Sequence, residues 1–133
     1  MGAEPPADLF AFLHGETDAA NFHHADHLRM AFEILRRHRD FLEAAQAYRG
    51  ALKIIAARAG NAGAYHETIT LAFLSLIAEQ MATRNYENFS TFVTQNADLL
   101  DKFALLRWYP SEQLDSAAAR ATFVLPRPRE ASR

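Results

Sequence analysis

The sequence predicts an all-α fold, a bundle of about five to six helices in a single domain. Half of the 133 residues are hydrophobic, so the chain can bury a substantial core. Apolar residues recur at helical spacing along the chain, and no segment shows the strict alternation of a strand. We expect the helical domain to cover residues 1–125, and we expect residues 126–133, rich in Pro and Arg, to form a disordered tail.

Capping residues and glycines divide this pattern into helices. Asp18 or Asn21 can cap the second helix and Asp40 the third, because such side chains accept hydrogen bonds from the first backbone N–H groups. Gly15 and Gly60 end the first and third helices, since glycine adopts the left-handed backbone of a helix end. The predicted helices cover residues 7–13, a second segment that ends near 38, then 41–58, 64–83, 85–95 and 98–108.

The segment 64–83 is apolar on nearly every side, which predicts a central, buried helix. The last helix is ended by Pro110, and the aromatic rings of Trp108 and Tyr109 are expected either to pack in the core or to contact a substrate ring. Residues 111–123 are expected to hold one or two short turns.

Composition excludes several classes of function. The net charge is −2 with acidic and basic residues mixed, so no broad basic field exists to bind nucleic acid. The chain has no cysteine, which excludes disulfides, thiolate metal sites and cysteine nucleophiles. No apolar run approaches bilayer length, and the first residues lack the features of a signal peptide. We therefore expect a cytoplasmic protein with neither a nucleic-acid nor a membrane partner.

Two short histidine clusters, at residues 22–28 and 65–68, carry the functional signal. On a helical wheel His24 shares the inward face of the second helix with its apolar residues, and His27 lies one turn away inside the same apolar arc. His23 falls on the edge of that arc. The second cluster behaves in the same way, because His66 shares a stripe with core residues of its helix. Glu67 lies about 100° away, where it could reach the site from its rim.

Short connections between helices favour antiparallel neighbours, so the second and fourth helices are predicted to run parallel. Their histidine clusters, in the first turn of each, would then meet at one end of the bundle. The first helix ends at His14, which becomes a further candidate at that end, although a loop histidine is usually just exposed. His38 lies about 21 Å farther along its helix from His24 and cannot join the site.

This constellation predicts a metal site. Neutral imidazole is the form that ligates a metal, and both burial and a helix N-terminus disfavour the charged form. His24, His27 and His66 match a mononuclear site for Zn, Fe, Ni, Cu or Mn with an open position for water or a small-molecule substrate. Glu67 is predicted as a fourth ligand or as the general base, and hence as the candidate catalytic residue.

Alternative functions fit the same residues. A metal-free polar pocket could bind a small molecule or another protein, and a buried histidine can also serve as a structural residue bonded to a backbone carbonyl. An oligomerising helical protein would instead expose a large apolar surface. The metal hypothesis lacks the His-Glu-x-x-His pattern and the doubled Glu-x-x-His of di-iron bundles.

The chain resembles a family of small, uncharacterised bacterial all-helical proteins with paired HxxH and YHET motifs. The resemblance rests on residues 22–31, 65–70, 96–100 and 107–109. It covers the chain from about 22 to 123 and implies that four residues belong together, namely His24, His27, His66 and Glu67. The resemblance implies no reaction, because that family has no established activity.

Overall fold

The computed structural model describes residues 6–128. Within that range the regular structure is helical and includes no strand, which confirms the all-α prediction. The α-helices are α1 (Ala7–Leu13), α2 (His24–Arg37), α3 (Phe41–Arg58), α4 (Glu67–Thr83), α5 (Phe89–Gln95), α6 (Ser111–Leu114) and α7 (Ala117–Ala121). Short 3-10 helices cover Ala19–Asn21, Ala62–Ala64, Ala97–Leu100 and Ala104–Arg107.

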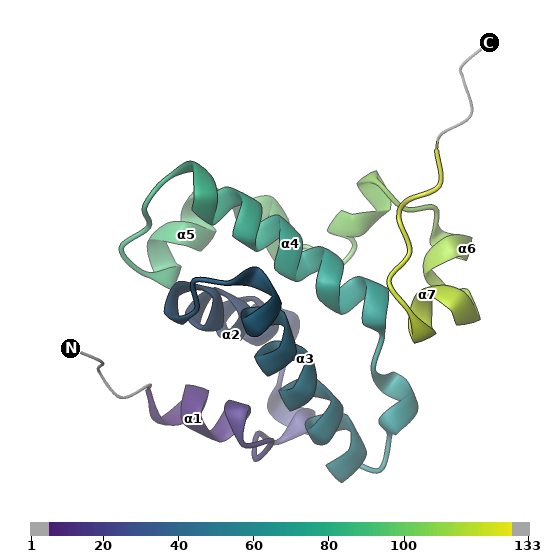
Figure 1. Ribbon diagram of the computed structural model, residues 1–133, viewed down its shortest axis with the longest axis horizontal. Coiled ribbons are helices and arrows are strands. Elements are labelled where there is room, and N and C mark those ends of the chain that lie inside the picture. Colours follow the sequence, from purple (N-terminus) through teal and green to yellow (C-terminus); the bar gives the residue numbers. More distant parts are fainter. Residues whose placement is uncertain (1–5, 129–133) are drawn as a thin grey trace.

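Three long helices, α2, α3 and α4, pack against one another and form the centre of the fold. Figure 1 shows α1 against the lower side of this group, α5 beside the C-terminal end of α4, and α6 and α7 beside its N-terminal end. The prediction that α4 is central is confirmed, since its buried residues include Leu74 and Ile77, both with no exposed surface. Burying each of these side chains stabilises the fold by about 2 kcal/mol.

Local signals place the ends of α1 and α3 where the sequence predicts them. The Asp40 carboxylate accepts a hydrogen bond from the Leu42 amide and so caps α3. Gly15, after α1, has a φ of +69°. A Cβ added to Gly15 would collide with the side chain of Ile54 on α3, so glycine both ends α1 and permits its close approach to α3.

The second and fourth helices begin later than the sequence predicts. Asp18 caps the 3-10 helix Ala19–Asn21 by accepting a hydrogen bond from the Ala20 amide. The α2 helix then starts at His24, and the carboxylate of Asp26 accepts from the backbone N–H of His23. The α4 helix starts at Glu67, which leaves His66 as its N-cap.

The predicted helix over residues 98–108 is wrong. That segment forms two separate 3-10 turns, interrupted at Asp101, which has an extended backbone. The Asp101 carboxylate accepts a hydrogen bond from the Phe103 amide at 2.9 Å. This local bond competes with helical pairing and favours a turn, which explains the break.

The C-terminal segment returns to the start of α4. The Thr68 hydroxyl donates to the Thr122 carbonyl at 2.7 Å and accepts from the Val124 amide at 3.1 Å. The buried Tyr109 donates its hydroxyl proton to the Val124 carbonyl, whereas Trp108 is largely exposed. Residues 126–128 are non-helical, and the rest of the predicted tail, 129–133, lies outside the described residues.

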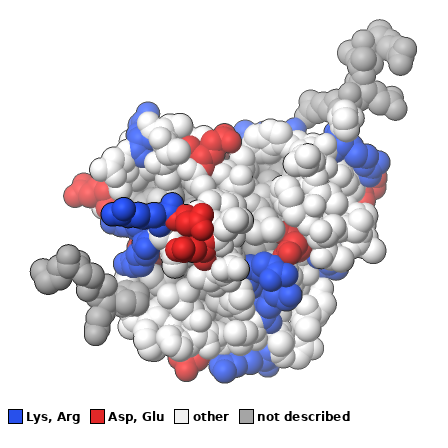
Figure 2. Space-filling model, in the orientation of Figure 1, with Lys and Arg blue, Asp and Glu red and all other residues white. Residues whose placement is uncertain are grey.

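Charged side chains of both signs are interspersed on the face shown in Figure 2, with no broad basic field among the described residues there. Within residues 6–128 no helix combines the length and the apolar character needed to cross a membrane.

Candidate functional site

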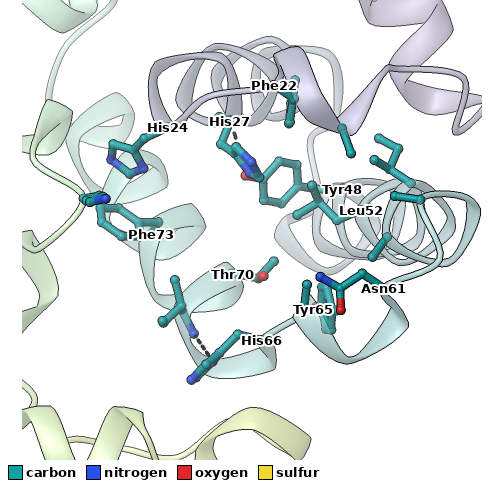
Figure 3. Close-up of a pocket in the computed structure, with 17 residues that line it drawn as sticks. Phe22, His24, His27, Tyr48, Leu52, Asn61, Tyr65, His66, Thr70 and Phe73 are labelled. Atoms are coloured by element: carbon teal, nitrogen blue, oxygen red, sulfur yellow. Dashed lines mark hydrogen bonds between the residues drawn. The ribbon is translucent and has the colours of Figure 1, made fainter.

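A cavity of about 470 Å³ opens among the N-terminal ends of α2 and α4 and the C-terminal half of α3 (Figure 3). We call it the histidine cavity. It is lined by Ala19, Phe22, His24, His27, Tyr48, Leu52, Ile55, Ala56, Ala59, Asn61, Ala64, Tyr65, His66, Ile69, Thr70, Phe73 and Lys102. His24 and His27 from the first sequence cluster and His66 from the second thus line the same cavity.

His24 is half-buried and fixed at one edge of its ring. Its Nε2 lies 2.8 Å from the Leu99 carbonyl oxygen, and the ring edge meets Phe73 with centroids 4.8 Å apart. Because a carbonyl only accepts, Nε2 carries the proton in this hydrogen bond. When the ring is neutral, its Nδ1 holds a lone pair, and no described residue hydrogen-bonds to this nitrogen.

His27 lies one turn along α2, beside the ring of Phe22 at a centroid distance of 4.3 Å. Burial lowers the pKa of His27 from 6.5 to about 4; the neighbouring His24 acts in the same direction and Asp26 opposes it. The imidazole is therefore neutral at pH 7. Among the residues that the structure describes, no group forms a hydrogen bond with its ring nitrogens.

His66 has both ring nitrogens engaged. Its Nδ1 accepts from the Ile69 amide at 3.1 Å, which caps α4, and its Nε2 donates to the Leu114 carbonyl at 2.7 Å. These two bonds require the neutral ring with its proton on Nε2. His66 thus has a structural role here, and it would have to break one of these bonds to ligate a metal.

Glu67 does not line the histidine cavity. Its carboxylate accepts from Arg49 Nε at 2.8 and 3.0 Å and from the Tyr65 hydroxyl at 2.6 Å. Burial alone would raise the pKa of Glu67, but the hydrogen bonds from Arg49 and Tyr65 outweigh it and lower the pKa below its ordinary value. A carboxylate that is ionised and already paired in this way is poorly suited to act as a general base.

Within residues 6–128, no three His, Cys, Asp or Glu side chains are grouped so that they could hold a metal ion. The donor set predicted from His24, His27, His66 and Glu67 is accordingly not assembled in this arrangement. Among the four predicted ligands, His24 and His27 line the cavity and each has a ring nitrogen without a hydrogen-bond partner among the described residues. Metal binding and the Zn, Fe, Ni, Cu or Mn assignment stay predictions.

The remaining histidines lie away from the histidine cavity. His14 is exposed, donates from Nδ1 to the Phe10 carbonyl and stacks on the Phe10 ring. His23 is exposed near Asp26, and Nδ1 of His38 lies 3.8 Å from a carboxylate oxygen of Glu43. Neither His23, which the wheel places on the edge of the apolar arc, nor His38, which the length of the helix excludes, lines the cavity.

Sequence reasoning missed four polar lining residues, Tyr48, Asn61, Tyr65 and Lys102. Tyr48 donates its hydroxyl proton to the His27 carbonyl at 3.3 Å and so fastens α3 to the start of α2. Lys102 comes from a turn that no local pattern places near His24. Tyr65 directly precedes His66 in the sequence, and this was the one signal among the four that could have predicted a lining residue.

Comparisons with protein-family models, with curated proteins and with solved structures find no match for this chain. The resemblance to a bacterial family with HxxH and YHET motifs therefore stays a prediction, and the function has to be argued from the cavity itself.

Proposed function

We propose that this protein binds a small organic molecule in the histidine cavity. The observation that supports the proposal is the cavity of about 470 Å³, walled mainly by apolar and aromatic side chains with a few polar groups. Small-molecule sites have this size and this composition, because the apolar wall supplies affinity and sparse polar groups fix orientation.

The residues suggest how a ligand would be held. Leu52, Ile55 and Phe73 offer an apolar surface for its body. The neutral His27 and the Nδ1 of His24 offer hydrogen-bonding groups one helical turn apart on the same wall. Figure 3 shows the Thr70 side chain between these histidines and His66, where it forms part of the lining. Because Glu67 is paired outside the cavity, we propose binding rather than acid–base catalysis as the activity.

A bulky side chain introduced into the histidine cavity should abolish binding of a small molecule there. Ala56 lines the histidine cavity, whereas the next residue on α3, Ala57, is exposed and does not. We expect Ala56→Phe to eliminate binding of a neutral aromatic probe, 2-naphthamide, and Ala57→Phe to leave it unchanged, as measured by calorimetry and by amide shifts in heteronuclear NMR. Circular dichroism establishes that each variant is folded. Equal binding by the two variants would contradict the proposal.

A second candidate is metal binding through His24 and His27. The observation that favours it is that both half-buried imidazoles face the histidine cavity one turn apart, and that His27 is held neutral. Untagged, metal-free protein should then take up Zn, Ni, Cu, Fe or Mn and gain thermal stability, and a His24→Gln/His27→Gln variant should not. An unchanged melting temperature with every metal would exclude this candidate.

We also propose a cytoplasmic location, since a chain without cysteine needs no oxidising compartment.

A further inference from the structure

Among the residues that the structure describes, no acidic side chain lines the histidine cavity. Its lining residues include neither Asp nor Glu, and they include a single cationic side chain, that of Lys102. The nearest candidate carboxylate from the sequence, Glu67, lies outside the wall and is neutralised by Arg49. A cationic ligand would therefore find no carboxylate partner among the lining residues and would lose its hydration on entry.

Two of the lining histidines, His66 and His27, add no fixed charge at neutral pH. His66 must be neutral to accept the Ile69 N–H bond while donating to the Leu114 carbonyl. His27 is neutral because burial disfavours its charged form. These two rings are thus uncharged polar groups of the wall, and the one lysine or arginine among the lining residues is Lys102.

Lys102 is exposed and lies at the rim of the cavity. Among the described residues it makes no ion pair, whereas Arg29, Arg37 and Arg49 each pair with a carboxylate. Its Nζ stands 5.2 Å from the centre of the Phe103 ring, a contact that leaves the ammonium free to bind an anion. One unpaired positive charge at the rim of an apolar cavity is complementary to an amphipathic ligand with one negative charge at its end.

We propose that the ligand is an organic monocarboxylate, with an apolar body in the histidine cavity and its carboxylate on Lys102. The inference rests on the proposed small-molecule function and specifies the class of molecule. A single ammonium matches the single charge of a carboxylate better than the nearly double charge of a phosphate monoester. The apolar wall near Leu52 and Phe73 requires that the rest of the molecule be uncharged.

Three probes that share one body test the charge preference: naphthalene-2-carboxylate, 2-naphthamide and 2-naphthylmethylammonium. Calorimetry on the full chain at pH 7.5 and low salt should give the tightest binding for the carboxylate, about fivefold tighter than the amide, and the weakest for the ammonium. Lys102→Met should lower the carboxylate affinity to that of the amide and leave the amide affinity unchanged. High salt should reduce the same preference.

Lys53→Met is the matched control, because it removes the same charge from a lysine that stands over the Tyr65 ring and does not line the cavity. It should keep the preference for the carboxylate. Equal binding of carboxylate and amide by the wild-type chain, or equal losses in the two lysine variants, would overturn the ligand class and leave the cavity as a binding site. If none of the three probes binds, the proposed function itself fails along with the ligand class.

Discussion

Protonation of His27 should destabilise the fold below neutral pH. Burial, His24 and an opposing Asp26 together set the pKa of His27 at about 4 in the folded chain, against 6.5 for an unperturbed histidine. Well above pH 6.5 the ring is neutral in both states and contributes no pH dependence. As the pH falls from 6.5 to 4, the unfolded chain binds a proton that the folded chain does not, so the free energy of unfolding decreases. Well below about pH 4 both states are protonated and the loss is complete.

The size of the effect follows from the two pKa values. Between pH 7 and pH 5 the linkage relation gives a loss of about 2 kcal/mol for a group that titrates at 6.5 when unfolded and near 4 when folded. His27 is half-buried rather than fully enclosed, so solvent screening reduces the expected loss to about 1–2 kcal/mol.

Urea unfolding of the wild-type chain and of His27→Gln at pH 7 and pH 5 measures this term. Glutamine does not titrate, and the other groups with shifted pKa values, Glu67 among them, contribute equally to both proteins. The wild-type chain should lose about 1–2 kcal/mol more than the variant on going to pH 5. Equal pH dependence in the two proteins would refute the reasoning, because His27 would then be exposed to solvent rather than held in the cavity wall.

Three further substitutions test the fold and the site. Leu74→Ala should lower the free energy of unfolding by about 3 kcal/mol, because it leaves a cavity in the core. Leu42→Ala should lower it by less than about 0.5 kcal/mol, because the Leu42 side chain is 69% exposed, and denaturant titration compares the two variants. Glu67→Gln should lower the free energy of unfolding by about 1 kcal/mol. It should also lower the pKa of Tyr65, which is raised by burial and by the hydrogen bond to Glu67. Ultraviolet titration of the phenol measures this pKa, and an unchanged value would show that the bond is absent. His66→Ala should lower the free energy of unfolding by about 2 kcal/mol, because it removes the cap of α4 and leaves the Leu114 carbonyl unpaired. His66→Asn should recover about half of this loss by restoring the cap. Equal losses in the two variants would argue against the capping role.

The ends of a helix and its buried face could be predicted wherever they depend on residues close together in the sequence. The ends of α3 follow from Asp40 at its start and the glycine turn beyond its end, and the ends of α1 follow from its apolar run and Gly15. The inward placement of His24 and His27 follows from helical periodicity alone. These features depend on residues within a few positions of one another, so one sequence suffices to predict them.

The state of each imidazole could not be predicted, because it depends on partners that are distant in the chain. The carbonyl that fixes His24 belongs to a residue 75 positions away, and the carbonyl that fixes His66 belongs to one 48 positions away. A wheel places His66 on an inward stripe but does not show that its nitrogens are already used. The pairing of Glu67 with Arg49 on another helix was equally invisible, and it removes the carboxylate from the predicted metal set.

Hydrogen bonds join the C-terminal segment to the start of α4, so we expect the stability of this segment to depend on whether the cavity holds a ligand. His66 contributes to the lining while it holds the Leu114 carbonyl, and Thr68, two residues on, holds the Thr122 carbonyl and the Val124 amide. Detachment of the segment would free the first turn of α4, so opening and ligand occupancy are thermodynamically linked. A molecule seated in the cavity should slow hydrogen exchange at the Val124 amide, and truncation of the segment should weaken binding without touching any residue of the wall.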